Sequence, residues 1–133
     1  MKSLFILAAL IGITQLSIAQ STDSASIDYT LTTQLNGTWK QTRTVIIKTG
    51  DTTIRKNEIE TFSFSVGEKT VEAIYSGTDG TIRQVTPITT NAVLTIINIL
   101  ERHYASLGYK VYQLDANRIA LKGKTRIKIL TKQ

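Results

Sequence analysis

Apolar and polar residues alternate with a period of two over much of this chain, in short runs separated by turn residues. In 61–66, for example, Phe62, Phe64 and Val66 fall on one face and threonine and serine on the other. This alternation is typical of half-buried β-strands. Similar runs cover 38–48, 52–66, 70–76, 82–88, 109–115, 118–123 and 125–131. Their regular spacing, with turn signals such as Asp79-Gly80 between them, predicts an all-β antiparallel barrel or sandwich.

The segment 89–108 fits two structures. As a helix it would begin at Asn91, a good N-cap residue, and stop at Gly108. Its apolar helical face would consist of Val93, Ile96, Ile97, Leu100, Tyr104 and Leu107. As a strand, the β-branched run 92–98 would be followed by a loop. The periodicity favours a helix around 92–107, and the β-branched composition and neighbouring strands favour the strand, so both interpretations stay open.

The first residues have the pattern of a secretory signal peptide. A positive start precedes an apolar run at 4–13, and small residues, Ser17 and Ala19, precede a cut before Gln20. The apolar run is short for a membrane anchor, which is the alternative. Residues 20–33 are rich in Ser, Thr and Asp, which is typical of a mobile arm. We therefore expect a signal peptide at 1–19, a flexible arm at 20–33, one domain at 34–133, and a periplasmic or secreted protein with no stable membrane insertion after cleavage.

The amino-acid composition excludes several kinds of functional site. The 133 residues include no cysteine and one histidine, which excludes disulfides and thiolate chemistry and leaves no basis for a metal site. The formal charge is +6 at pH 7, but aromatic residues do not interleave the basic C-terminal segment, so we expect no nucleic-acid partner. Glu58, Glu60 and Glu72 are the carboxylates that could pair as acid and base. We expect instead that these glutamates lie on solvent-exposed strand faces, where most charged residues are found. We expect no enzyme activity and no cofactor.

The single tryptophan lies in Gly37-Thr38-Trp39, which resembles the Gly-x-Trp signature of the lipocalin family. The segments 61–64 and 109–123 resemble the mid-chain strand and closing hairpin of small bacterial lipocalin-like domains. The resemblance implies an antiparallel up-and-down β-barrel of about eight strands. Trp39 would plug its base, and Gly37 would give room. A cation from the last strand would cover the indole; Arg126 is the best positional match and Arg118 the second.

The interior of such a barrel would supply any binding site. The interior residues expected to line it are Phe62, Phe64, Val71, Tyr75, Ile119 and Leu121. Strict alternation also places Arg43 and Gln41 on the face of Trp39. A buried charge needs a partner, so Arg43 indicates an anionic headgroup or an internal ion pair. We expect a protein that binds or shields a small, partly hydrophobic molecule. The alternatives are an envelope protein–protein interaction module with a filled core and, last, a carboxylate hydrolase or isomerase.

Overall fold

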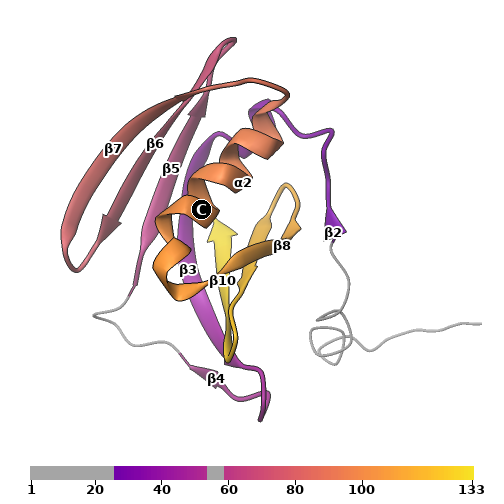
Figure 1. Ribbon diagram of the computed structural model, residues 1–133, viewed down its shortest axis with the longest axis vertical. Helices are drawn as coiled ribbons and strands as arrows, with labels where there is room; N and C mark the ends of the chain where they lie inside the picture. The colour runs from indigo at the N-terminus through magenta and orange to yellow at the C-terminus, as the bar shows by residue number, and fades with distance from the viewer. Residues whose placement is uncertain (1–25, 54–58) are drawn as a thin grey trace, which may run out of the picture.

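The computed structural model describes residues 26–53 and 59–133 (Figure 1). The predicted signal peptide, and the predicted arm up to residue 25, lie outside the described residues. Over these residues the fold is mostly β, with one α-helix, α2 (Ala92–His103). Short 3-10 helices cover Thr33–Leu35 and Ala105–Leu107. The strands are β2 (Ser26–Ile27), β3 (Gly37–Ile46), β4 (Thr52–Thr53), β5 (Thr61–Val66), β6 (Thr70–Gly77), β7 (Gly80–Pro87), β8 (Lys110–Leu114), β9 (Arg118–Lys122) and β10 (Arg126–Lys132).

The strands form one strongly curved sheet in the order β2-β8-β9-β10-β3-β5-β6-β7, with β4 paired to β3. Every ladder is antiparallel except that between β2 and β8. The mainly β fold predicted from the alternation is confirmed. The sheet is not closed, because its edge strands β2 and β7 do not pair with each other in the described chain, so a complete barrel is not shown. Helix α2 lies in the hollow of the sheet and contacts β6, β7 and β8 (Figure 1).

Helix α2 decides between the two interpretations of 89–108. The Asn91 side chain caps it by accepting a hydrogen bond of 2.9 Å from the Leu94 amide. The α-helix ends at His103, before the expected 107, and a 3-10 turn follows that ends at Gly108 with a left-handed φ of 72°. Leu107, expected on the apolar face, is 61% exposed. The helix buries one broad face against the sheet: Ala92, Val93, Thr95, Ile96, Ile97, Ile99 and Leu100. The helical period therefore outweighed the β-branched composition, because it covers the hollow of the sheet with one continuous apolar face.

Trp39 is fully buried in the main core, and its indole N–H donates to the Leu35 carbonyl over 3.0 Å. Lys132 stands directly opposite Trp39 on β10, and its Nζ lies 5.8 Å from the ring centre. Arg126 pairs with Ile46 at the other end of the same ladder, so Lys132, and not Arg126, is the cation over the indole. Gly37 has a φ of +119°, and a Cβ there would come within 3.4 Å of Lys132 Cε. The positive φ therefore favours glycine here, whereas the contact of a Cβ with Lys132 Cε would be an ordinary van der Waals one.

A β-bulge changes which residues of β3 face the helix. Ile129 pairs with Arg43, but the next residue, Leu130, pairs with Gln41. The extra residue, Thr42, reverses the alternation beyond it. Arg43 consequently shares the outer face of the sheet with Ile129, whereas Gln41 stays on the inner face with Trp39. The single face expected for Gln41 and Arg43 is therefore wrong.

A second, smaller apolar cluster lies on that outer face. It consists of Val45, Tyr112, Ala120, Ile127 and Ile129. Arg43 and Arg118 line a shallow groove beside it, together with Ile129 and Thr131. Arg43 therefore lies on the outer face, and its predicted position in the interior is wrong.

Candidate functional site

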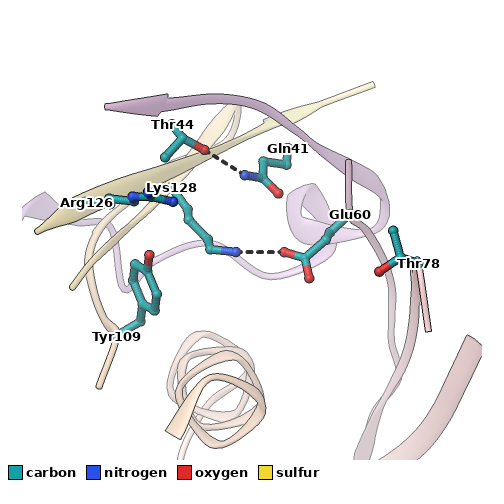
Figure 2. A pocket seen from close by; sticks show the side chains of 7 residues that line it. All are labelled: Gln41, Thr44, Glu60, Thr78, Tyr109, Arg126 and Lys128. Carbon is teal, nitrogen blue, oxygen red and sulfur yellow. Dashed lines mark hydrogen bonds and ion pairs between the residues drawn. The ribbon is translucent and has the colours of Figure 1, made fainter. Parts of the chain in front are cut away.

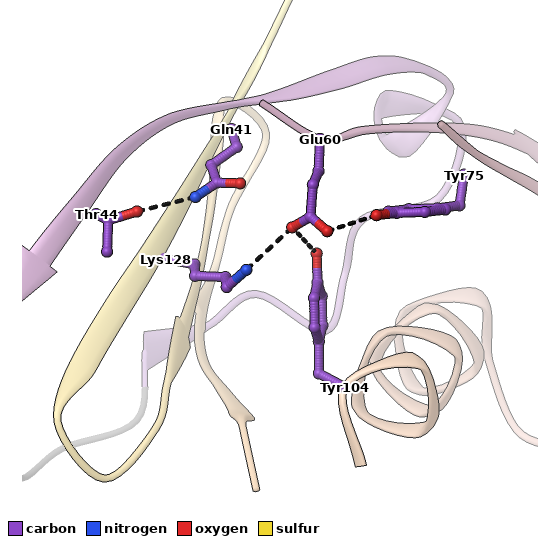
Figure 3. A network of polar contacts seen from close by, with 6 residues as sticks. All are labelled: Gln41, Thr44, Glu60, Tyr75, Tyr104 and Lys128. Carbon is purple, nitrogen blue, oxygen red and sulfur yellow. Dashed lines mark hydrogen bonds and ion pairs between the residues drawn. The ribbon is translucent and has the colours of Figure 1, made fainter. Parts of the chain in front are cut away.

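Glu60 is the centre of a polar cluster on the inner side of the sheet (Figure 3). It directly precedes β5 and accepts a hydrogen bond of 2.5 Å from the Tyr75 hydroxyl on β6. The Tyr104 hydroxyl, from the C-cap of α2, donates to it over 2.8 Å. Lys128 Nζ, from β10, donates over 3.0 Å. The Glu60 carboxylate therefore links β6, β10 and the end of α2 through hydrogen bonds.

The environment of Glu60 keeps it charged. Burial alone raises the pKa of Glu60, but hydrogen bonds from Tyr75, Tyr104 and Lys128, with the charge of Lys128, outweigh burial and leave the pKa below its ordinary value. The pKa values of Tyr75 and Tyr104 are raised by burial and by Glu60, so both phenols stay protonated donors. A carboxylate with a lowered pKa and filled acceptor sites is poorly suited to take a proton near neutral pH. The hydrogen bonds of the cluster therefore keep Glu60 ionised and fix its position.

Lys128 is enclosed as well as paired. Its Nζ lies 4.8 Å from the centre of the Tyr104 ring and 5.5 Å from that of Tyr109. The side chains of Lys128 and Glu60 are only 17% and 16% exposed. Cation–π contacts strengthen as the cation loses water. The ammonium is therefore fixed between two aromatic rings and a carboxylate.

His103 packs into the aromatic wall of this cluster. Its ring centre lies 4.1 Å from that of Tyr75, 5.3 Å from Phe62 and 4.7 Å from Tyr104. Burial lowers the pKa of His103; the Glu60 charge opposes this effect and the Lys128 charge adds to it. Within 26–53 and 59–133, no three His, Asp or Glu side chains group as metal ligands. His103 therefore packs against the aromatic residues of the cluster, and its burial favours the neutral imidazole.

A pocket of about 170 Å³ opens beside the cluster (Figure 2). Its lining residues are Gln41, Thr44, Glu60, Thr78, Tyr109, Arg126 and Lys128. The Gln41 amide nitrogen donates to Thr44 Oγ1 over 2.9 Å, and both side chains are buried. Arg126 is exposed. The pocket thus combines a polar floor with an accessible guanidinium.

Most of the residues predicted to bind a ligand lie elsewhere. Phe62, Phe64, Val71, Ile119 and Leu121 are in the main core, at most 3% exposed, and none of them lines the pocket. Tyr75 contacts Glu60, one residue of the pocket wall. Arg126, expected over Trp39, is in the pocket instead. Sequence reasoning placed Gln41 on the face of Trp39 without naming it as a site residue, and it missed Thr44, Thr78, Tyr109 and Lys128. The bulge in β3 concealed Thr44, because strict alternation places it on the face opposite Trp39.

Comparisons with known proteins do not identify this chain. Neither the scan against protein-family models nor the search of curated proteins gave a match. Among the described helices, none has the length and apolar character needed to cross a membrane.

Proposed function

We propose that this protein binds a small molecule that carries a carboxylate and a short apolar part, without catalysing a reaction. The observation that carries the proposal is Arg126 at the wall of the 170 Å³ pocket. Glu60 and Lys128 neutralise each other there, so Arg126 gives the lining a net positive charge. Arginine also offers a planar donor set that matches a carboxylate.

The other lining groups support the same ligand class. Burial raises the pKa of Tyr109, although the charge of nearby Arg126 lowers it, so the phenol remains a hydrogen-bond donor beside the guanidinium. The Tyr109 ring supplies an apolar wall. At about 170 Å³, the pocket is smaller than the ~300–1,000 Å³ of typical ligand-binding clefts. The ligand is therefore smaller than the drug-sized molecules that fill typical binding clefts.

Binding of small carboxylates tests this proposal. Isothermal titration and NMR would compare acetate, butyrate and benzoate with their neutral amides. We expect a carboxylate to bind and to shift the Tyr109 and Thr44 resonances. Arg126→Gln should weaken binding about tenfold or more, since a charge-assisted hydrogen bond contributes ~1.5–3 kcal/mol. Arg102→Gln, an exposed arginine on α2, is the matched control and should leave binding unchanged. Equal affinities of the two variants would refute the assignment of Arg126.

We also propose that the chain is a lipocalin-like protein that works in the periplasm or outside the cell. The Gly37-Thr38-Trp39 motif, with Trp39 buried under a cation from the last strand, supports the family. Helix α2, packed in the hollow of a sheet that is not closed, counts against it. The signal pattern of residues 1–19 supports the localisation. Mass spectrometry of the protein from its own host would test both cleavage before Gln20 and the presence of a co-purified carboxylate. A protein that retains residues 1–19 would contradict the localisation.

An interaction module remains the second candidate. Its specific support is the filled main core, in which Trp39, Phe62 and Leu100 are at most 1% exposed. Repeated recovery of protein without a small molecule, with no carboxylate binding in titration, would favour this candidate over the first.

A further inference from the structure

Gly123 is a glycine that its backbone conformation alone does not require. It directly follows β9 and is not one of the glycines with a positive φ, so the backbone there accepts other residues. Its amide donates to the Arg126 carbonyl over 2.8 Å and closes the turn into β10. A substitution at Gly123 would therefore act through the space around its Cα and not through backbone strain.

The Tyr109 ring occupies the space that a side chain at residue 123 would need. Lys110 of β8 pairs with Lys122 of β9, so the next step along this antiparallel ladder brings Tyr109 beside Gly123. A Cβ on Gly123 would lie 2.9 Å from the ring carbon Cε1 and 3.1 Å from its two neighbours, Cδ1 and Cζ. Three nearly equal distances place this Cβ over the face of the ring. Nonbonded carbon atoms are most stable ~3.5–4.0 Å apart, so the ring would have to move.

The Tyr109 ring is also packed on other sides. The Tyr104 ring meets it at an angle of 64°, with 5.7 Å between the ring centres. Lys128 Nζ lies 5.5 Å from its centre, and Tyr109 as a whole is only 8% exposed. Tyr109 and Lys128 line the pocket, whereas Gly123 does not (Figure 2). A ring pushed off Gly123 would therefore move into the pocket, because the pocket is the free space beside it.

We propose that Gly123 sets the width of the pocket and thereby limits the size of its ligand. The bare Cα of Gly123 lets the Tyr109 ring lie against the backbone, which leaves room beside Arg126 for the apolar part of a carboxylate longer than acetate. This role rests on the proposed carboxylate binding, to which it adds a limit on ligand length. Gly123 acts through Tyr109, so it is a positioning residue that does not touch the ligand.

The small volume of the pocket makes residue 123 a sensitive position. The pocket holds only about 170 Å³. One methylene more or less in a fitted apolar site changes affinity by about tenfold or more. Butyrate is two methylenes longer than acetate, so it needs more of the space that the displaced Tyr109 ring would fill. We therefore expect Gly123→Ala to select against the longer carboxylate.

Titration of the full chain with acetate and with butyrate, followed by NMR, tests this role. We expect Gly123→Ala to weaken butyrate binding about tenfold and acetate binding less than about threefold. Partial unfolding would lower both affinities equally, so the ratio of the two affinities separates the two causes. Thr125→Ala, at an exposed position of the same turn, is the matched control and should change neither affinity. An unchanged ratio in Gly123→Ala would overturn the role of Gly123, while butyrate binding by the native chain would still support the proposed function.

Two further measurements test whether Gly123 acts through Tyr109. In a chain with Tyr109→Ala, addition of Gly123→Ala should change neither affinity, because the ring that it displaces is absent. In the native chain without ligand, the ring current of Tyr109 should shift a Gly123 Hα resonance upfield. Additive effects of the two substitutions, or Gly123 Hα shifts at ordinary glycine values, would overturn the role of Gly123. A native chain that binds neither carboxylate would overturn the proposed function and this role together.

Discussion

Lys128 and Glu60 form a partly buried ion pair of 3.0 Å between β10 and the start of β5, on opposite sides of β3. The two residues are 68 positions apart in the sequence. Tyr75 and Tyr104 donate to the same carboxylate, so its negative charge is shared among three donors. This pair forms one wall of the candidate pocket and also joins parts of the fold that are distant in the chain.

Removal of the Lys128 charge should destabilise the protein. Lys128→Met keeps most of the stem but leaves Glu60 charged and half-desolvated. Loss of one partner from a buried pair costs ~3–5 kcal/mol, and the tyrosine donors should reduce this to about 2–3 kcal/mol. Urea unfolding at neutral pH measures the loss. The control is Arg83→Met, which breaks the exposed pair with Glu72 and should cost less than about 1 kcal/mol. Similar losses for both variants would contradict the role given to Lys128.

Gly37 should tolerate alanine worse than Gly50 does. Both glycines have positive φ, but the +76° of Gly50 lies near the left-handed region that other residues can adopt, whereas the +119° of Gly37 lies far from it. We expect Gly37→Ala to lower the free energy of unfolding by about 1–3 kcal/mol and Gly50→Ala by about 1 kcal/mol. Thermal unfolding of the two variants checks the difference. An equal or larger loss at Gly50 would contradict this prediction.

His103 should make stability depend on pH in mildly acidic solution. Burial lowers its pKa from 6.5 in the folded state, so the unfolded chain binds the proton first. Stability should therefore fall as the pH drops below 6.5 and level off below the folded-state pKa. His103→Gln should show a smaller loss between about pH 7 and pH 5.5. NMR titration of the single imidazole measures the folded-state pKa, and a value at or above 6.5 would contradict this prediction.

Asn91 should stabilise the start of α2. Its side chain accepts the Leu94 amide, so Asn91→Ala should cost about 1 kcal/mol of stability. Asn98→Ala, at an exposed position inside the same helix, is the matched control. It should be neutral or slightly stabilising, because alanine has the higher helix propensity. Chemical denaturation of both variants provides the comparison. Equal effects would mean that the cap contributes nothing measurable.

Several features could be predicted from the sequence because they depend on local pattern. The alternation around Phe62 and Phe64 predicts a strand with one buried face, and β5 has it. Asp79-Gly80 predicts the tight turn between β6 and β7. Asn91 and the apolar positions after it predict the helix as one of two interpretations. In each case the deciding residues are neighbours in the chain, so backbone preference and periodicity suffice.

The site required the tertiary structure. Because of the bulge at Thr42, Arg43 lies on the outer face of the sheet. The β3–β10 register sets Lys132 over Trp39, and Arg126 lies in the pocket. A register shift of one residue reverses every side chain beyond it, and nothing local in the sequence marks where the shift occurs. The sequence by itself thus determined the strands, the turn and the buried aromatic residues. Pairing between distant segments alone decided which charged groups meet at Glu60, because those contacts depend on strand register and not on local preference.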